Sequence, residues 1–301
     1  MNELVTPSLL SFASRGPTAM ADQQTVSRSS LMQGKRGLIM GVANDHSIAW
    51  GIARTLSQHG ATLAFTYQGD ALAKRVKPLA EEAGSSFVMP CDVEDIASVD
   101  AVFSEIKKQW STMDFLVHAV AFSDKNELKG HYADSTRENF IRTMVISCYA
   151  FTEAAKRAAA LMPNGGAMVT LTYNGGMRAM PNYNVMGVAK AALEASVRYL
   201  AVDFGPQKIR VNAISAGPIR TLAGAGITDA RYMFAFQQKY SALGRGVTLE
   251  ELGGAGLYLL SDLSTGVTGE IHFVDSGYNV IAMPQPDALK ASGASEGNGD
   301  G

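Results

Sequence analysis

The chain of 301 residues carries 26 Lys and Arg against 28 Asp and Glu, a formal net charge of −2. Affinity for nucleic-acid phosphates needs a cationic surface, so this charge argues against a general nucleic-acid-binding protein. No apolar run approaches the roughly 20 residues that cross a bilayer. The two cysteines and five histidines show no metal-ligand spacing. We therefore expect no membrane span, no disulfide framework and no metal site.

The two ends of the chain differ in composition from its middle. Residues 1–33 are rich in Ser and Thr with few charges, and residues 284–301 contain a single large apolar side chain, Leu289. Such segments cannot bury enough apolar surface to offset their ordering entropy, so we expect a disordered leader and a disordered tail around a domain at 34–283. No basic stretch precedes the apolar N-terminal patch, which favours a cytoplasmic protein over a secreted one. An organellar transit peptide is the alternative for the leader.

Within 34–283, short apolar runs alternate with segments whose apolar residues recur at helical spacing. Strands are predicted at 36–43, 61–67, 86–91, 113–121, 166–173, 209–215 and 270–274. Helices are predicted at 47–59, 70–83, 95–110, 135–161, 183–204 and 248–260. The first helix illustrates the pattern, with Ile48, Ile52 and Leu56 on one face and Gly60 as its C-terminal cap.

The predicted strands are apolar throughout, as expected when helices cover both faces of a sheet. Strands and helices that alternate along the chain form parallel sheets with right-handed crossovers. The sequence therefore predicts an α/β fold, a single-domain doubly wound parallel sheet of the Rossmann type, with about seven strands and helices on both faces. Residues 217–247 break the alternation, which is typical of a lid or substrate loop. For the part of this segment at 222–236, the alternative is a surface helix that packs its Met and Phe side chains into the core.

A strand-to-helix turn from Gly41 to Gly51 stands where dinucleotide-binding folds hold a pyrophosphate. Gly41 allows a tight turn, backbone N–H groups at the start of the helix at 47–59 can bind phosphates, and Ser47 adds a hydroxyl. The full G-x-G-x-x-G pattern is absent, however. An ordinary turn with Ser47 as the helix N-cap is the alternative.

Two polar residues at later strand ends are candidates for contacts with the adenosine of a dinucleotide. Gln68 ends the second strand, where a carboxylate would bind a ribose 2′-hydroxyl and an arginine would bind a 2′-phosphate. Gln68 is neutral and no Arg or Lys lies between it and Lys74, which favours NADH over NADPH. Asp92 follows the third strand and can accept a hydrogen bond from the adenine amino group. The alternatives are a plain loop residue for Gln68 and a cap of the helix at 95–110 for Asp92.

The strongest pattern is the pair Tyr183 and Lys190 in the predicted helix at 183–204. Seven helical steps return to within about 20° of the same face, so both long side chains can reach a common ligand. A nearby ammonium stabilises a phenolate, which makes Tyr183 a candidate proton donor. Tyr173 ends the preceding strand and offers a second phenol at the same edge. A Tyr and a Lys on one helix are often structural, but their place after the fifth strand favours a catalytic pair.

These motifs resemble the short-chain dehydrogenase/reductase superfamily and, more narrowly, the bacterial enoyl-acyl-carrier-protein reductases of type II fatty-acid synthesis, over residues 34–283. The phosphate turn has Ser47 and Ala49 in place of the superfamily's later glycines. The spacing Tyr-x6-Lys replaces the usual Tyr-x3-Lys, with Gly187 at the usual lysine position. The similarity extends to the segments 118–130 and 216–223. Departures from the family pattern remove no catalytic group and fall at Ala119, Thr172, Asn174, Gly176 and Met177.

The resemblance implies that NADH delivers hydride to the β-carbon of a trans-2-enoyl thioester on acyl carrier protein. The implied catalytic residues are Tyr183, Lys190 and Tyr173. Tyr183 is implied to hydrogen-bond the thioester oxygen as enolate charge develops, Lys190 to hold the nicotinamide ribose, and Tyr173 to help orient the substrate. The implied cofactor-binding residues are Gly41, Ser47, Ile48, Gln68, Asp92, Val93, Val120, Lys190 and Ile219. The implied substrate-binding residues are Ser123, Tyr173, Tyr183 and the loop 222–236. A homotetramer is also implied, with the apolar segment 272–283 as a candidate contact.

Two other functions are alternatives. A carbonyl or alcohol reductase of the same superfamily predicts Tyr-x3-Lys and an upstream serine, and the sequence has neither. A non-catalytic dinucleotide-binding sensor predicts the loss of Tyr183 or Lys190, and the sequence retains both.

Overall fold

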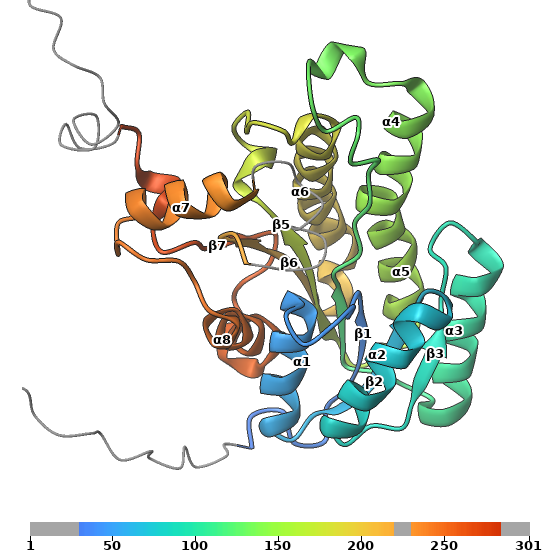
Figure 1. Ribbon diagram of the computed structural model, residues 1–301. Coiled ribbons are helices and arrows are strands. Elements are labelled where there is room, and N and C mark those ends of the chain that lie inside the picture. Colours follow the sequence, from blue (N-terminus) through green and yellow to red (C-terminus); the bar gives the residue numbers. More distant parts are fainter. Residues whose placement is uncertain (1–29, 220–229, 284–301) are drawn as a thin grey trace, which may run out of the picture.

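The computed structural model describes residues 30–219 and 230–283, which contain a seven-stranded sheet in the order β3-β2-β1-β4-β5-β6-β7 (Figure 1). All neighbouring strands are parallel. The strands are β1 (Arg36–Met40), β2 (Thr62–Tyr67), β3 (Val88–Pro90), β4 (Phe115–His118), β5 (Gly166–Thr172), β6 (Ile209–Ala216) and β7 (Ile271–Val274). The strand order reverses between β1 and β4, the kind of switch point at which open α/β sheets bind ligands. The predicted doubly wound parallel sheet is confirmed.

Helices cover both faces of this sheet. The α-helices of the described residues are α1 (Ile48–Gln58), α2 (Gly69–Glu82), α3 (Ile96–Trp110), α4 (Arg137–Met144), α5 (Ala150–Ala159), α6 (Asn184–Phe204), α7 (Ala230–Tyr240) and α8 (Leu249–Leu260). Successive side chains of β1 point to opposite faces: Leu38 and Met40 join a core with α3, α5 and α6, whereas Ile39 joins a core with α1, α2 and α8. None of these described helices is long and apolar enough to cross a membrane.

Some elements differ from their predictions in extent or type. The predicted helix at 135–161 is divided into α4, a π-helical turn η2 (Val145–Tyr149) and α5. The segment 217–247 contains α7, so a helix, which was the alternative, is present in part of the predicted loop. Residues 220–229, most of the predicted leader and the predicted tail at 284–301 lie outside the described residues.

The close contact between α1 and α8 depends on glycine. A Cβ atom on Gly253 would lie 2.1 Å from Thr55 Oγ1 and 2.8 Å from the Gly51 carbonyl oxygen. A Cβ atom on Gly254, the next residue of α8, would meet no atom within 4 Å. Gly253 therefore sets how closely α8 approaches α1.

We predict opposite effects for alanine at these adjacent positions. Gly253→Ala over-packs the contact, which costs about 1–3 kcal/mol of unfolding free energy. Gly254→Ala favours the helix without a clash and adds about 0.5–1 kcal/mol. Chemical denaturation of both variants beside the parent protein measures the two changes. Equal effects at the two positions would show that the contact at Gly253 does not limit the packing of α8.

Candidate active site

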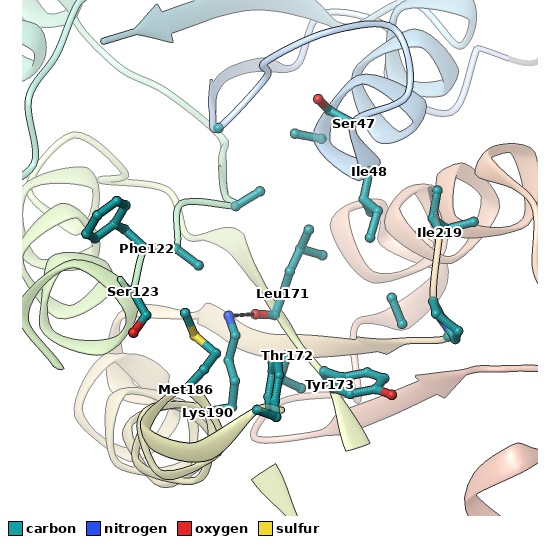
Figure 2. A pocket seen from close by; sticks show the side chains of 18 of the residues that line it. Ser47, Ile48, Phe122, Ser123, Leu171, Thr172, Tyr173, Met186, Lys190 and Ile219 are labelled. Carbon is teal, nitrogen blue, oxygen red and sulfur yellow. Dashed lines mark hydrogen bonds between the residues drawn. The ribbon is translucent and has the colours of Figure 1, made fainter. Parts of the chain in front are cut away.

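A cavity of about 370 Å³ opens at the carboxyl edge of the sheet. Its walls come from the turn after β1, the loop after β4, the end of β5, the start of α6, the chain after β6, and α7. Figure 2 shows Ile48 and Ile219 on one side of the opening, Phe122 and Ser123 on the other, and Lys190 between them. The residues predicted from the sequence that line this cavity are Gly41, Ser47, Ile48, Ser123, Tyr173, Tyr183, Lys190 and Ile219.

The chain leaves β1 through Gly41, at a point where a side chain has no room. Gly41 has a φ of +103°, and a Cβ atom there would lie 2.3 Å from the carbonyl oxygen of Ala119. The neighbouring parallel strands β1 and β4 both end beside this contact between Gly41 and Ala119. Their last residues are Met40 and His118, earlier than the sequence predicts. The result is a backbone cradle at Gly41 that packs against Ala119 and lines the cavity.

The Ser47 hydroxyl holds the turn that follows. It accepts hydrogen bonds from the backbone N–H groups of Ala43 and Asn44 at 3.0 and 3.1 Å. Ser47 occupies the N-cap position of α1 but makes no side-chain bond to the helix. Ile48 and Ala49, at the N-terminus of α1, also line the cavity. The first N–H groups of a helix lack partners within it and favour an anion such as a pyrophosphate.

Lys190 is a buried cation in the cavity wall. Its side chain lies on α6, and Nζ donates a hydrogen bond to the Leu171 carbonyl oxygen at 2.8 Å (Figure 2). Burial lowers the pKa of Lys190 to about 8, and its electrostatic coupling to Cys148 and Glu194 opposes this shift. His118 is buried at the end of β4, where burial and the charge of Lys190 lower its pKa to about 3. His118 therefore stays neutral beside the ammonium.

Two phenols meet in the same wall. The rings of Tyr173 and Tyr183 pack edge to face with centroids 5.2 Å apart. Burial raises the pKa of both phenols, so each stays protonated and can donate a hydrogen bond. The sequence predicted Tyr183 inside a helix at 183–204. In the structure Tyr183 lies one residue before α6. It still shares the cavity with Lys190, since its backbone already has right-handed helical angles.

Two glycines bring the start of α6 against the 3-10 turn η3 (Asn174–Gly176). A Cβ atom on Gly187 would lie 2.8 Å from the Gly175 carbonyl oxygen. A Cβ atom on Gly175 would lie 2.5 Å from the ring of Tyr183. A lysine at position 187, as in Tyr-x3-Lys, therefore has no room. The cation stands at position 190 instead, about one helical turn further along.

Glu194 is a buried carboxylate that the sequence analysis did not single out. It accepts a hydrogen bond from Thr172 Oγ1 at 2.7 Å, and burial raises its pKa. Glu194 links the end of β5 to α6 next to Lys190. Its position four residues after Lys190 places it on the same helix face, and this spacing could have identified it.

The loop after β4 is held by two further polar side chains that the sequence analysis missed. Ser147, in the π-helical turn η2, accepts a hydrogen bond from the Phe122 N–H and donates one to the Phe122 carbonyl, each at 3.0 Å. Asn139 of α4 accepts from the Asp124 N–H at 3.0 Å and donates to Ser123 Oγ at 3.2 Å. No sequence pattern indicates these bonds, because they depend on how α4 and η2 pack against the loop.

Four predicted cofactor residues do not line this cavity. These residues are Gln68, Asp92, Val93 and Val120. Gln68 is exposed at the end of β2, whereas Val93 and Val120 pack against the core. Asp92 accepts a hydrogen bond from the Glu94 N–H at 2.9 Å, and Asp95, rather than Asp92, caps α3. All four follow β2, β3 or β4, so they lie at the same edge of the sheet as the cavity, and Val120 stands between the lining residues Ala119 and Ala121.

The helix α7 closes another side of the cavity. Met233 and Phe234 line it with apolar surface, and Gln237 of the same helix donates a hydrogen bond to the Tyr173 hydroxyl. Of the predicted substrate loop 222–236, residues 222–229 lie outside the described residues.

The buried ammonium of Lys190 predicts a stability change. Its pKa is about 8 in the fold against 10.5 for a free lysine, so the unfolded chain binds more protons than the folded one between these values. The destabilisation by the buried charge of Lys190 has its full size below pH 8 and decreases as the pH rises towards 10.5. We predict that Lys190→Met raises the unfolding free energy of the cofactor-free protein at pH 7, and that this gain shrinks at higher pH. Denaturation of both proteins across this range measures the difference, and parallel profiles would contradict the prediction.

Comparisons with known proteins agree with one another. The model of the family "Enoyl-(Acyl carrier protein) reductase" matches residues 41–279. Enoyl-acyl-carrier-protein reductase (NADH) 2 of Rhizobium meliloti (strain 1021) is 71% identical over 266 residues, which are 88% of this chain and 99% of that protein. The crystal structure of FabI from Candidatus Liberibacter asiaticus is 60% identical with a TM-score of 0.84, over 85% of this chain and 100% of that one. The Anaplasma phagocytophilum enoyl-acyl-carrier-protein reductase, in complex with NAD, is 56% identical with a TM-score of 0.83, over 85% and 98%.

Proposed function

The chain belongs to the enoyl-acyl-carrier-protein reductase family and is an NADH-dependent oxidoreductase of fatty-acid synthesis, and we propose that the cavity at the carboxyl edge of its sheet is the active site. The observation that supports this proposal is the meeting of Tyr173, Tyr183 and Lys190 in one cavity with the glycine turn after β1. The substrate is the trans-2-enoyl thioester of acyl carrier protein.

The residues along the sheet edge suit a dinucleotide. The proposed cofactor-binding residues are Gly41, Ser47, Ile48, Lys190 and Ile219, which line the cavity, and Gln68, Asp92, Val93 and Val120 at the same edge of the sheet. The bare cradle at Gly41 and the N-terminus of α1 suit the pyrophosphate. Lys190 donates one of its three N–H bonds to Leu171 and has others for ribose hydroxyls. Bound NADH supplies the hydride that adds to the β-carbon of the enoyl thioester.

Tyr183 stabilises the negative charge that the reaction places on the thioester oxygen. Its phenol is buried and protonated, so it donates a hydrogen bond to this oxygen as the enolate forms. The ammonium of Lys190 in the same wall lowers the energy of the developing anion, because the surroundings that desolvate Lys190 also screen its charge poorly. Tyr183 and Lys190 are the proposed catalytic pair.

Tyr173, Ser123 and α7 form the proposed substrate side of the cavity. Tyr173 orients the thioester next to Tyr183, and Ser123 lies across the opening, held by Asn139. Met233 and Phe234 offer apolar surface that suits an acyl chain.

An assay with two cofactors and two substrates tests the function. Purified protein should oxidise NADH with a trans-2-enoyl-acyl-carrier-protein, more slowly oxidise NADPH, and leave a β-ketoacyl substrate unchanged. Turnover of the ketone alone would indicate the carbonyl-reductase alternative. Saturable NADH binding without turnover of either substrate would indicate the sensor.

We predict that Tyr183→Phe lowers kcat while NADH still binds. The variant keeps the ring packing on Tyr173 and loses only the phenolic donor, and removing one donor to a developing oxyanion costs about 10²- to 10³-fold in kcat. Steady-state kinetics gives kcat, and titration of the intrinsic fluorescence gives NADH affinity. Unchanged turnover would exclude Tyr183 from the reaction.

The homotetramer implied by the resemblance is a further proposal. Large apolar side chains are exposed on η2 and α6, where Tyr149 is 54% and Tyr199 is 76% exposed. Within the segment 272–283, Val280 is 70% and Met283 is 80% exposed. Apolar surface of this kind is typical of contacts between subunits. Sedimentation equilibrium measures the assembly directly.

Residues 34–283 are the proposed reductase domain, with 217–247 as its substrate loop. We also propose that the enzyme works in the cytoplasm. Cys91 and Cys148 are free thiols, which suits a reducing compartment.

A further inference from the structure

Gln237 connects α7 to the proposed active site through one side chain. It is 4% exposed, and its Nε2 donates a hydrogen bond to the hydroxyl of Tyr173, 64 residues earlier in the chain. On the same helix, Met233 and Phe234 line the cavity that contains Tyr173. The bond therefore joins the apolar side of the cavity to its phenolic side.

The direction of this bond decides what the phenol of Tyr173 can do. A phenol has one hydrogen to donate and lone pairs that accept, and the amide N–H of Gln237 takes a lone pair. Among the described residues, no acceptor is found for the Tyr173 hydrogen itself. Asp275 is the carboxylate whose charge acts on Tyr173, but its oxygens accept from Gly277 and Asn279. Within residues 30–219 and 230–283 the Tyr173 hydrogen is thus left for a ligand.

The donor also changes the strength of that hydrogen bond. An N–H that donates to a phenol oxygen polarises the O–H bond, and hydrogen bonds in a chain strengthen one another. In agreement, the bond from Gln237 opposes the rise in the pKa of Tyr173 that burial causes. The ring itself is fixed by its edge-to-face contact with Tyr183, 5.2 Å between centroids.

We propose that Gln237 is a positioning residue for the reaction: its amide holds the phenol of Tyr173 so that the O–H donates to the acyl thioester. This inference rests on the proposed role of Tyr173 in orienting the substrate. It adds a residue of α7 that acts on the substrate through Tyr173.

A double-mutant cycle between Gln237 and Tyr173 tests the proposal. Gln237→Met keeps the length of the side chain and removes the donor, and Tyr173→Phe removes the phenol. We expect Gln237→Met to lower kcat/KM for a trans-2-enoyl thioester about fivefold to tenfold, as for the loss of one hydrogen bond, and to leave the KM for NADH unchanged. In the Tyr173→Phe background, Gln237→Met should cause no further loss.

Gln238→Met is the matched control, because Gln238 is the exposed neighbour on the same helix. It should keep the parent kcat/KM and melting temperature. Gln237→Asn provides a second variant if Gln237→Met fails to fold, since it keeps the amide but is one methylene too short to reach Tyr173. It should show the same loss.

Three outcomes would overturn the proposal, and they are distinguishable. A loss from Gln237→Met that is equal in both backgrounds would show that Gln237 acts through the packing of α7 alone. Full activity of Gln237→Met, with Tyr173→Phe impaired, would remove Gln237 from the mechanism and leave the proposed role of Tyr173 intact. Full activity of Tyr173→Phe would refute that role and the inference with it.

Discussion

The backbone contact between Gly187 and Gly175 determines the geometry of the proposed site. The start of α6 reaches the turn η3 because neither residue has a side chain, and the ring of Tyr183 covers Gly175. This contact places Tyr183 edge to face against Tyr173. It also fills the space that a lysine at position 187 would need. The Tyr-x6-Lys spacing is therefore a packing consequence, and the cation enters the cavity from Lys190.

The buried polar groups of this site lower the stability of the folded protein. Lys190 and Glu194 are buried ionisable groups, each with a hydrogen bond to the end of β5. Within the described residues, both ring nitrogens of His118 lack a hydrogen-bond partner, which is expensive for a buried polar group. Groups of this kind concentrate at functional sites, where stability is traded for reactivity. A cofactor that binds the folded protein alone restores stability through linkage.

Patterns among residues close together in the sequence predict most strands of the sheet, but they predict fewer of the contacts that build the site. The strand alternation and the pair Tyr183 and Lys190 can be recognised because both depend on residues close together in the sequence. The predicted helix at 135–161 was wrong as a continuous α-helix, since η2 forms where Ser147 bonds to the loop at Phe122, 25 residues away. The helix propensities of residues 135–161 do not indicate such a long-range contact. The early ends of β1 and β4 likewise go with the contact between Gly41 and Ala119, which forms only when both strands are in place.

The two sides of the cavity are therefore built by different means. The cofactor side is formed by backbone, at Gly41 and the N-terminus of α1, so a short segment of sequence indicates where it lies, although the full G-x-G-x-x-G pattern is absent. The substrate side depends on single side chains that connect distant segments, such as Asn139 to the loop after β4 and Gln237 to Tyr173. Substitutions on the substrate side can reshape the acyl pocket while the backbone cradle keeps its form. A change in acyl preference then requires no change in the cofactor turn or in the pair Tyr183 and Lys190, because the bonds of Asn139 and Gln237 belong to the other side of the cavity.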